Sequence, residues 1–224
     1  MSVRAQVQTL TVGEIASALA GATAVFRKHK IDFCCGGAIS LDEAARKRGV
    51  DPATIRAELD ALAQESPDVP VESPALCDHI VQRYHDVHRR ELPELIRLAR
   101  PVEAVHRDHP LAPKSLADAL EAVLENLLDH MTKEERILFP AIRERFGGSL
   151  FGPIAVMRHE HNHHGEEVRA IEALAHGFTP PPDACSSWRA LYSGLEKFAG
   201  DLAEHIHLEN NILFPRFERP GSRT

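Results

Sequence analysis

Residues 130–140 of this chain read HMTKEERILFP, and residues 205–215 read HIHLENNILFP. Each stretch places a Glu four residues after a His and then, after a two-residue gap, the sequence Ile-Leu-Phe-Pro. Side chains four residues apart lie on one face of an α-helix, about 5–6 Å apart at Cβ. The repeat therefore predicts two helices that each direct an imidazole and a carboxylate toward one point.

The repeat extends beyond these two stretches. His130 and His205 are 75 residues apart, and a His-x-x-His motif at residues 85–88 recurs 76 residues later at residues 161–164. Each His-x-x-His precedes one copy of the longer motif, so order, spacing and residue type all match. This pattern predicts a duplicated helical hairpin folded about a pseudo-two-fold axis.

Composition and breaker residues predict an all-α chain. Of the 224 residues, 43% are apolar, 26% are charged and only 5% are aromatic, and the dominant Ala, Leu, Glu and Arg favour helix. Proline and glycine divide the larger part of the chain into four long segments joined by short connections, which is typical of an antiparallel four-helix bundle. We expect these helices over residues 75–99 with a kink at Pro93, 115–145, 153–176 and 185–217, with a loop at 101–113, a break at 147–148 and loosening near Gly194 and Gly200.

The first third of the chain predicts a separate small helical domain. Caps and breakers favour helices from Thr11 to Leu19, from Thr23 to about His29, from Ser40 to Gly49 and from Asp51 to about Gln64. Three prolines between residues 66 and 74 end the helical pattern there. We therefore expect a small domain at 8–65, a proline-rich linker at 66–75 and the bundle at 76–218.

Charge and hydropathy argue against two classes of partner. The net charge is −7 and the pI is near 6, and the dispersed Lys and Arg form no basic patch of the kind that binds nucleic acid. No apolar run approaches the roughly 18 residues that a membrane helix needs, and the first residues lack an apolar signal core. We expect a cytoplasmic protein that binds no nucleic acid and no membrane, and whose four cysteines form no structural disulfide.

The histidines and glutamates of the repeat predict a metal centre. Four imidazoles and two carboxylates exceed what one tetrahedral zinc requires but suit two metal ions, each with two His, joined by bridging carboxylates. Mixed nitrogen and oxygen ligands favour iron, with manganese second. The candidate ligands are His85, His130, Glu134, His161, His205 and Glu209. The repeat alone fits His88 as well as His85, and His164 as well as His161.

Other residues near the repeat have simpler interpretations. A single His-x-x-x-Glu is common on solvated helix faces, and only the duplication favours a metal site. We expect the Ile-Leu-Phe residues at 137–139 and 212–214 to lie in the core, and Pro140 and Pro215 to kink or relax their helices. The histidines expected to face solvent are His79, His106, His109, His176 and His207, and the pair His159 and His163 should point away from His161.

Cys34 and Cys35 are candidate reactive thiols. Adjacent cysteines form a disulfide only with strain, and the nearby Arg27, Lys28 and Lys30 could lower a thiol pKa. Inert burial of the two thiols is the alternative. The two remaining cysteines, Cys77 and Cys185, have no such surroundings and are expected to serve packing.

Several motifs beyond the repeat point to a known family. They are FCCGG at 33–37, YHDVH at 84–88, ELPEL at 91–95, GPIAVM at 152–157 and TPPP at 179–182. With the repeat, they cover nearly the whole chain and resemble the repair-of-iron-centres family (the YtfE/ScdA type) of haemerythrin-like di-iron proteins. The resemblance implies a haemerythrin-like bundle after a ScdA-type domain. It also implies two iron ions held by His85, His130, Glu134, His161, His205 and Glu209, with both Glu bridging, and so selects His85 and His161 among the alternatives.

The resemblance also implies a function. The family restores iron–sulfur clusters damaged by nitrosative or oxidative stress, so damaged iron–sulfur proteins would be the partners and iron supply the activity, assisted by Cys34 and Cys35. One alternative is an enzyme that binds or reduces nitric oxide at the di-iron site; another is a haemerythrin-like O2 binder or iron sensor. Position 165 is Gly where haemerythrin has a His, which favours access for small molecules or release of iron. A homodimer is a further possibility.

Overall fold

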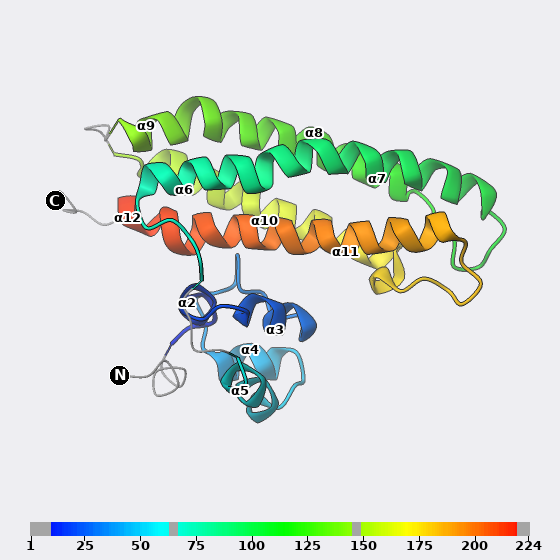
Figure 1. Cartoon of the computed structure of the whole chain (residues 1–224), viewed down its shortest axis with the longest axis horizontal. Coiled ribbons are helices and arrows are strands. Elements are labelled where there is room, and N and C mark those ends of the chain that lie inside the picture. The colour runs from blue at the N-terminus through cyan, green and yellow to red at the C-terminus, as the bar shows by residue number, and fades with distance from the viewer. Residues whose placement is uncertain (1–9, 63–66, 145–148, 219–224) are drawn as a thin grey trace. The chain divides into compact units, whose positions relative to one another are not determined.

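The structure, a computed structural model, describes residues 10–62, 67–144 and 149–218. Within these residues it is all-α, and the one β pairing recorded is an isolated antiparallel bridge between Thr11 and Ser40. Four long helical segments form a bundle, and a small helical domain precedes them in the chain (Figure 1). The predicted fold class is confirmed.

The described residues divide into two compact units. One contains residues 10–62, 67–76, 149–151 and 203–218, and the other contains residues 77–144 and 152–202. The domain limits predicted at 8–65, 66–75 and 76–218 stay a prediction. Their ends at residues 8, 65 and 66, together with the predicted helix ends near Gln64 and residue 145 and the break at 147–148, lie outside the described residues.

Four short helices form the N-terminal part of the first unit: α2 (Val12–Ala18), α3 (Ala22–Lys28), α4 (Leu41–Lys47) and α5 (Pro52–Asp60). Local capping explains where three of them begin. The side chain of Thr11 accepts a hydrogen bond from the Glu14 amide in a capping box, Ser40 accepts one from Glu43, and Asp51 accepts one from Ala53 ahead of Pro52.

The predicted cap at Thr23 is wrong. α3 begins after Gly21, which has a φ of 85° that favours glycine. Thr23 therefore lies inside the helix, and its hydroxyl donates to Glu204 at 3.2 Å. The core beneath these helices includes Phe26 and Phe33, which are 0% and 2% exposed.

The first long segment of the bundle consists of α6 (Ser73–Ile80), the π-helix η1 (Val81–His85) and α7 (Asp86–Val105). The loop predicted from Pro101 begins later than expected, because Pro93 and Pro101 both lie inside α7. Proline removes one backbone donor from a helix. The helix continues nevertheless, since Ala99 and Val102 on either side of Pro101 are buried in the core.

The second segment consists of α8 (Leu116–Lys133), the π-helix η2 (Glu134–Leu138) and α9 (Phe139–Arg143). The third is α10 (Phe151–Leu174), followed by the short η3 (His176–Phe178). The fourth consists of α11 (Ser186–His207), the π-helix η4 (Leu208–Leu213) and α12 (Pro215–Glu218). These segments match the four predicted helices to within a few residues.

The loosening predicted near Gly194 and Gly200 does not occur, because α11 is continuous through both. Gly194 instead permits a close approach of α7. A Cβ built at Gly194 would lie 2.6 Å from Cδ2 of Leu95, which is itself buried. The glycine thus marks tight helix packing rather than a break.

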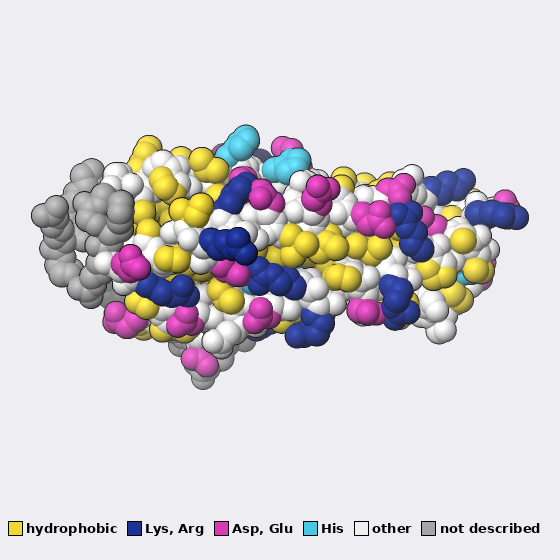
Figure 2. Space-filling view, turned by 90° about the horizontal axis from the view of Figure 1, so that it is seen from above, with side chains coloured by type: hydrophobic (Ala, Val, Ile, Leu, Met, Phe, Trp, Pro, Cys, Tyr) yellow, Lys and Arg dark blue, Asp and Glu magenta, His cyan; other side chains and the backbone are white. Residues whose placement is uncertain are grey.

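The core of the bundle contains most of the repeated Ile-Leu-Phe residues. Leu138, Phe139, Leu213 and Phe214 are all buried, as predicted. Ile137 is not, since it is 63% exposed; it lies in η2, where the wider turn directs it outward. On the face in Figure 2, acidic and basic side chains are interspersed. No helix among the described residues is long and apolar enough to cross a membrane.

Candidate metal centre

Three of the four long segments widen into a π-helix where candidate ligands lie. His85 is the last residue of η1, Glu134 is the first residue of η2, and Glu209 is the second residue of η4. A backbone N–H donates to the carbonyl five residues earlier in each, as from Phe139 to Glu134 and from Phe214 to Glu209. Single π turns inside α-helices are frequent at functional sites.

The two prolines of the repeat help explain two of these wide turns. Proline has no N–H, and its ring clashes with the carbonyl four residues earlier in a regular α-helix. Pro140 and Pro215 come directly after η2 and η4, within two residues of their ends. The relaxation of the helices predicted at these prolines is therefore present. It lies in the turns that precede the prolines and contain Glu134 and Glu209. η1 contains no proline, and no pattern in its sequence predicts this wide turn.

In the second unit, three imidazoles and one carboxylate converge. Nε2 of His85 lies 3.4 Å from Oε2 of Glu134, and Nε2 of His130 lies 3.4 Å from Oε1 of the same side chain. Nε2 of His161 lies 3.1 Å from Nε2 of His130. All four side chains are at most 1% exposed. In the first unit, Nε2 of His205 lies 3.3 Å from Oε1 of Glu209, and both residues are fully buried.

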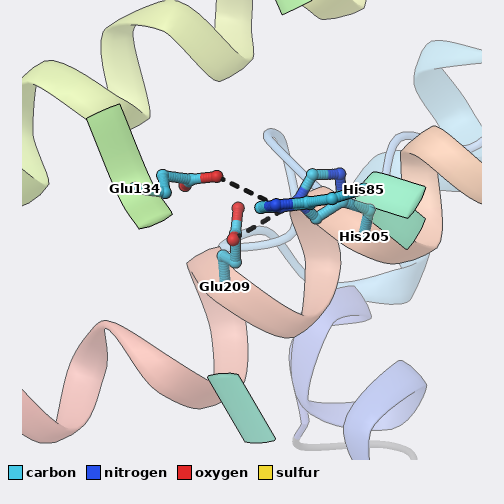
Figure 3. Close-up of side chains that lie close together, drawn as sticks. All are labelled: His85, Glu134, His205 and Glu209. Atoms are coloured by element: carbon cyan, nitrogen blue, oxygen red, sulfur yellow. Dashed lines mark ion pairs between the residues drawn. The ribbon is translucent and has the colours of Figure 1, made fainter. Parts of the chain in front are cut away.

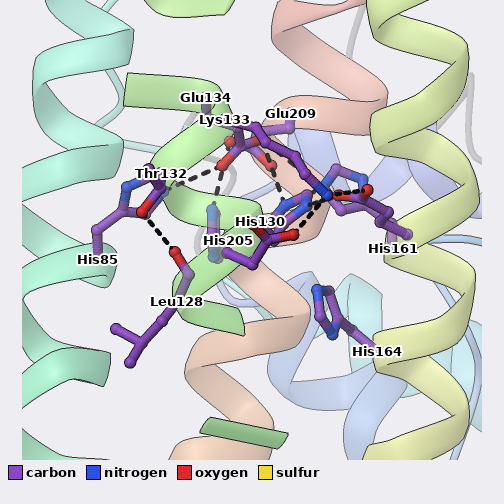
Figure 4. Close-up of polar contacts among 12 residues, drawn as sticks. His85, Leu128, His130, Thr132, Lys133, Glu134, His161, His164, His205 and Glu209 are labelled. Atoms are coloured by element: carbon purple, nitrogen blue, oxygen red, sulfur yellow. Dashed lines mark hydrogen bonds and ion pairs between the residues drawn. The ribbon is translucent and has the colours of Figure 1, made fainter. Parts of the chain in front are cut away.

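These six residues form two groups that could each hold a metal ion. The first group is His85, Glu134, His205 and Glu209 (Figure 3), and the second is His130, Glu134, His161 and Glu209 (Figure 4). Within a group, the ligand atoms all lie within 4.8 Å of one another. Glu134 and Glu209 belong to both groups, whereas each His belongs to one. All six are residues that the sequence singled out as candidate ligands.

The side chains present fit a bound metal. Both carboxylate oxygens of Glu134 are buried and accept no hydrogen bond from any described residue, and a buried carboxylate without such partners is costly unless it is paired or coordinates a metal. Imidazole nitrogen and carboxylate oxygen are ligands that iron, manganese and zinc all accept. A cation at this centre would replace the missing partners of Glu134.

Two further carboxylates orient the imidazoles, and the sequence did not single them out. Oε1 of Glu135 lies 2.7 Å from Nδ1 of His85, and Oε2 of Glu160 lies 2.8 Å from Nδ1 of His130. Such contacts fix the ring, so that Nε2 would be free to bind a metal ion. The hydrogen bond with His130, aided by Lys133, lowers the pKa of Glu160 to about 2, and the bond with His85 lowers that of Glu135. In the sequence, Glu135 follows the candidate ligand Glu134, and Glu160 precedes the candidate ligand His161. Helical spacing alone does not show that these carboxylates contact imidazoles.

The other histidines divide into buried and exposed sets. His88 and His164 are buried, but neither belongs to a metal-binding group; Nδ1 of His164 lies 2.8 Å from Glu167. His159, His163 and His176 are exposed. The prediction that His207 faces solvent is wrong: it is 3% exposed and packs edge-on against Phe33. Its Nε2 lies 3.3 Å from the Ser17 hydroxyl.

Cys34 and Cys35 lie in the loop between α3 and α4, and neither forms a disulfide. The expected lowering of their pKa by neighbouring cations is not found. Arg27 pairs with Glu204 and Lys28 pairs with Glu58. Hydrogen bonding to Cys35, burial and the nearby Asp32 instead raise the pKa of the Cys34 thiol well above its usual value. Of the other two cysteines, Cys77 is buried as expected, but Cys185 is exposed.

Comparison with known proteins identifies the class to which this bundle and its His/Glu centre belong. The family model described as "Hemerythrin HHE cation binding domain" matches residues 78–217. A second model, ScdA_N, described as a domain of unknown function, matches residues 8–63. The bundle is therefore a cation-binding domain of the hemerythrin type, and the N-terminal helices form a ScdA-type domain.

Individual relatives identify the family within this class. The chain is 48% identical over 212 residues to "Iron-sulfur cluster repair protein YtfE" of Musicola paradisiaca, and the match covers 92% of this chain and 95% of the relative. Proteins of the same name from Dickeya chrysanthemi and Escherichia coli O81 are each 47% identical, over 92% of this chain. The chain belongs to the YtfE family of iron–sulfur cluster repair proteins, as the sequence motifs predicted.

Proposed function

We propose that this protein repairs damaged iron–sulfur clusters and supplies iron from a centre of two iron ions. His85 and His205 would bind one ion, His130 and His161 would bind the other, and Glu134 and Glu209 would bridge them. The observation that carries the proposal is the presence of both carboxylates in each of the two buried groups. The names of the relatives, which are 47–48% identical over 92% of the chain, support the repair function.

The protein's own side chains suit a store from which iron can leave. Each ion would receive two imidazoles and a share of two carboxylates, which leaves coordination positions for exogenous ligands. Glu135 and Glu160 hold two of the imidazoles in place, so the ligand set would keep its arrangement as iron enters and departs. The bound iron would be the material returned to a damaged cluster.

The partners under this proposal are iron–sulfur proteins damaged by nitrosative or oxidative stress. Three properties remain predictions from the sequence: a cytoplasmic location, a response to such stress and a homodimer.

The proposal is tested by incubating the iron-loaded protein anaerobically with an enzyme whose iron–sulfur cluster has been damaged. We expect more recovery of activity than from the same amount of free Fe(II). Glu134→Gln should abolish this excess, because it removes the charge of the shared carboxylate. Glu166→Gln is the matched control, since Glu166 is exposed on α10. Recovery no greater than with free iron would refute the proposal.

A second function, reduction of nitric oxide, is favoured by the same pair of adjacent groups. Two metal ions that share carboxylates could hold two small molecules close together, which lowers the entropic cost of their reaction. Anaerobic mixing of the diferrous protein with nitric oxide would then produce nitrous oxide. Formation of a stable adduct without nitrous oxide would exclude this activity.

A further inference from the structure

A second set of metal-binding side chains lies in the N-terminal domain. Asp32, Cys34 and Cys35 in the loop between α3 and α4 bring one carboxylate oxygen and two sulfurs within 4.8 Å of one another. The Sγ atoms of Cys34 and Cys35 are 3.8 Å apart, and Sγ of Cys34 is 3.4 Å from Oδ1 of Asp32. All three residues are partly exposed.

These separations match the edges of a tetrahedral coordination sphere. Two thiolates that each lie about 2.3 Å from a tetrahedral ion are about 3.8 Å apart. A thiolate and a carboxylate oxygen on the same ion are about 3.6 Å apart, since the metal–oxygen distance is about 2.0–2.2 Å. The observed 3.8 and 3.4 Å agree with both values. An ion could thus enter with little movement of the ligands.

The loop is held in this conformation from two sides. Oδ1 of Asp32 accepts hydrogen bonds from the backbone N–H groups of Cys35 at 2.9 Å and Gly36 at 3.0 Å. On the other side, the side-chain amides of Asn210 and Asn211 each donate to the carbonyl oxygen of Cys34 at 3.2 Å. Ligands fixed before the ion arrives lose less entropy when they bind it.

We propose that Asp32, Cys34 and Cys35 form a second metal site, which binds a divalent cation of borderline softness through one carboxylate and two thiolates. Three ligands leave one tetrahedral position open, as in sites that exchange a ligand. The identification of the cation as Fe(II) rests on the proposed function. Its open position would accept a ligand from a recipient protein.

Metal binding changes the protonation of the two thiols. Binding replaces the two thiol protons, which pass to solvent, with one divalent ion. Two thiolates and a carboxylate then surround a charge of +2, so no excess positive charge is buried.

Co(II) tests the site in the reduced full-length protein, because thiolate ligands give cobalt a near-ultraviolet charge-transfer band. Cobalt in the His/Glu centre of the bundle lacks thiolates and does not contribute to that band. We expect the band in the wild type, about half of it in Cys34→Ser and in Cys35→Ser, and none in the double variant. Cys185→Ser should keep the full band, since Cys185 is exposed and outside the cluster.

Asp32→Asn tests the carboxylate. The asparagine oxygen can still accept from the N–H groups of Cys35 and Gly36, so the loop should keep its conformation, which far-ultraviolet circular dichroism and the thermal unfolding midpoint would verify. We expect cobalt to bind this variant about tenfold more weakly or worse, because loss of a direct ligand should cost at least as much as loss of the group behind one. Equal affinity in the folded variant would remove Asp32 from the site.

Equilibrium dialysis against Fe(II) tests the identity of the metal. The wild type should bind one more iron per chain than the Cys34→Ser/Cys35→Ser double variant. Equal iron content would overturn the assignment to iron, and absence of the cobalt band in the folded wild type would overturn the site itself. Neither measurement uses cluster repair, so failure of the repair assay with the band intact would refute the proposed function alone.

Discussion

Glu135 and Glu160 show how a residue outside the candidate ligand set can orient candidate ligands. Each carboxylate contacts Nδ1 of an imidazole, and a basic side chain contacts the same carboxylate: Arg89 in one case and Lys133 in the other. These contacts leave Nε2 of His85 and His130 directed at Glu134. The orientation of both rings is thereby set before any metal binds.

We predict that Glu160→Ala lowers metal affinity roughly 10–100-fold, the usual effect of removing the group that orients a metal-binding His. The imidazole of His130 would lose the partner of Nδ1 and rotate more freely. Competition with a chelator of known affinity measures the change. Glu166→Ala, on the exposed face of the same helix, should bind metal like the wild type; equal affinity in both variants would contradict the role of Glu160.

Gly37 explains why the loop that carries Cys34 and Cys35 ends in two glycines. Its carbonyl accepts a hydrogen bond from the Gly13 N–H at 2.8 Å, which joins the loop to α2. A Cβ at Gly37 would lie 2.6 Å from the Phe33 carbonyl oxygen and 3.0 Å from Cα of Gly13. Both are backbone atoms, so a side chain at this position forces the loop and α2 apart.

Gly37→Ala should therefore destabilise the N-terminal domain by about 1–3 kcal/mol, the range for overpacked sites. Faster amide hydrogen exchange in α2 and in the loop at residues 32–37 would measure the effect locally. Gly152→Ala is the control, since a Cβ there meets nothing within 4 Å, and it should leave exchange in α2 unchanged. Unaltered exchange in Gly37→Ala would show that the backbone adapts without cost.

At the scale of elements, three π-helices carry candidate ligands and depart from regular α geometry. A π turn contains one residue more than an α turn between hydrogen-bonded groups. In η2 the N–H of Phe139 bonds to the Glu134 carbonyl, and the exposed Ile137 lies between them. Without Ile137, the same bond would join residues four apart, as in an α-helix.

Deletion of Ile137 should therefore be tolerated. We expect the variant to keep its helix content, to change its free energy of unfolding by less than about 1 kcal/mol, and still to bind metal, because Glu134 and Phe139 need not move apart. Deletion of Glu125, an exposed residue of regular α8, is the contrasting case. This deletion rotates the preceding part of α8 by about 100° relative to the candidate ligands. We expect loss of stability, measured by circular dichroism, and loss of metal binding, measured by metal analysis.

The fold followed from the sequence wherever a local rule agreed with burial. Ser40 and Asp51 cap the helices that their patterns predicted, and the proline and glycine breakers placed the four bundle helices. The exceptions arose from contacts distant in sequence. Burial of Val102 keeps Pro101 inside α7, and the close approach of Leu95 requires Gly194 within a continuous helix. Neither contact is visible in a local pattern.

The six candidate ligands could be proposed because duplication repeats their spacing, and all six belong to the two groups that could hold a metal ion. The contacts of Glu135 and Glu160 and the burial of His207 could not be predicted. Each depends on which helix or loop packs against the residue. The pKa of Cys34 was misjudged for the same reason. Arg27 and Lys28 are close in sequence, but Glu204 and Glu58 bind them, while Asp32 lies next to the thiol.

At the scale of the whole molecule, a network of ion pairs around the buried carboxylate of Asp201 stabilises the bundle. Asp201 of α11 is 8% exposed and accepts from Arg83 at 3.0 Å and from Lys197 at 2.8 Å. Lys197 also contacts Glu91 of α7 at 2.7 Å. Burial raises the pKa of Asp201, but Arg83 and Lys197 outweigh it and lower that pKa below its ordinary value.

This pKa predicts a loss of stability in acid. The unfolded chain takes up the Asp201 proton near the ordinary pKa of about 3.9, before the folded protein does. The stabilisation is thus complete above that pH and is lost as the pH falls through the lower, folded value. Asp201→Asn should cost about 1–3 kcal/mol of unfolding free energy at pH about 7, and the difference from wild type should shrink toward pH about 3. Urea unfolding measures both, with Asp108→Asn, which is 94% exposed in its side chain, as the unaffected control.

The duplicated hairpin has a consequence for symmetry. Counted by the 75-residue spacing, Glu135 of the first half corresponds to Asn210 of the second, yet Glu135 contacts His85 while Asn210 donates to Cys34. A homodimer of single hairpins would carry the same residue at both positions and would have to use it for one purpose. Fusion of the halves into one chain removes that restriction, so one half can orient a ligand while its counterpart holds the dithiol loop.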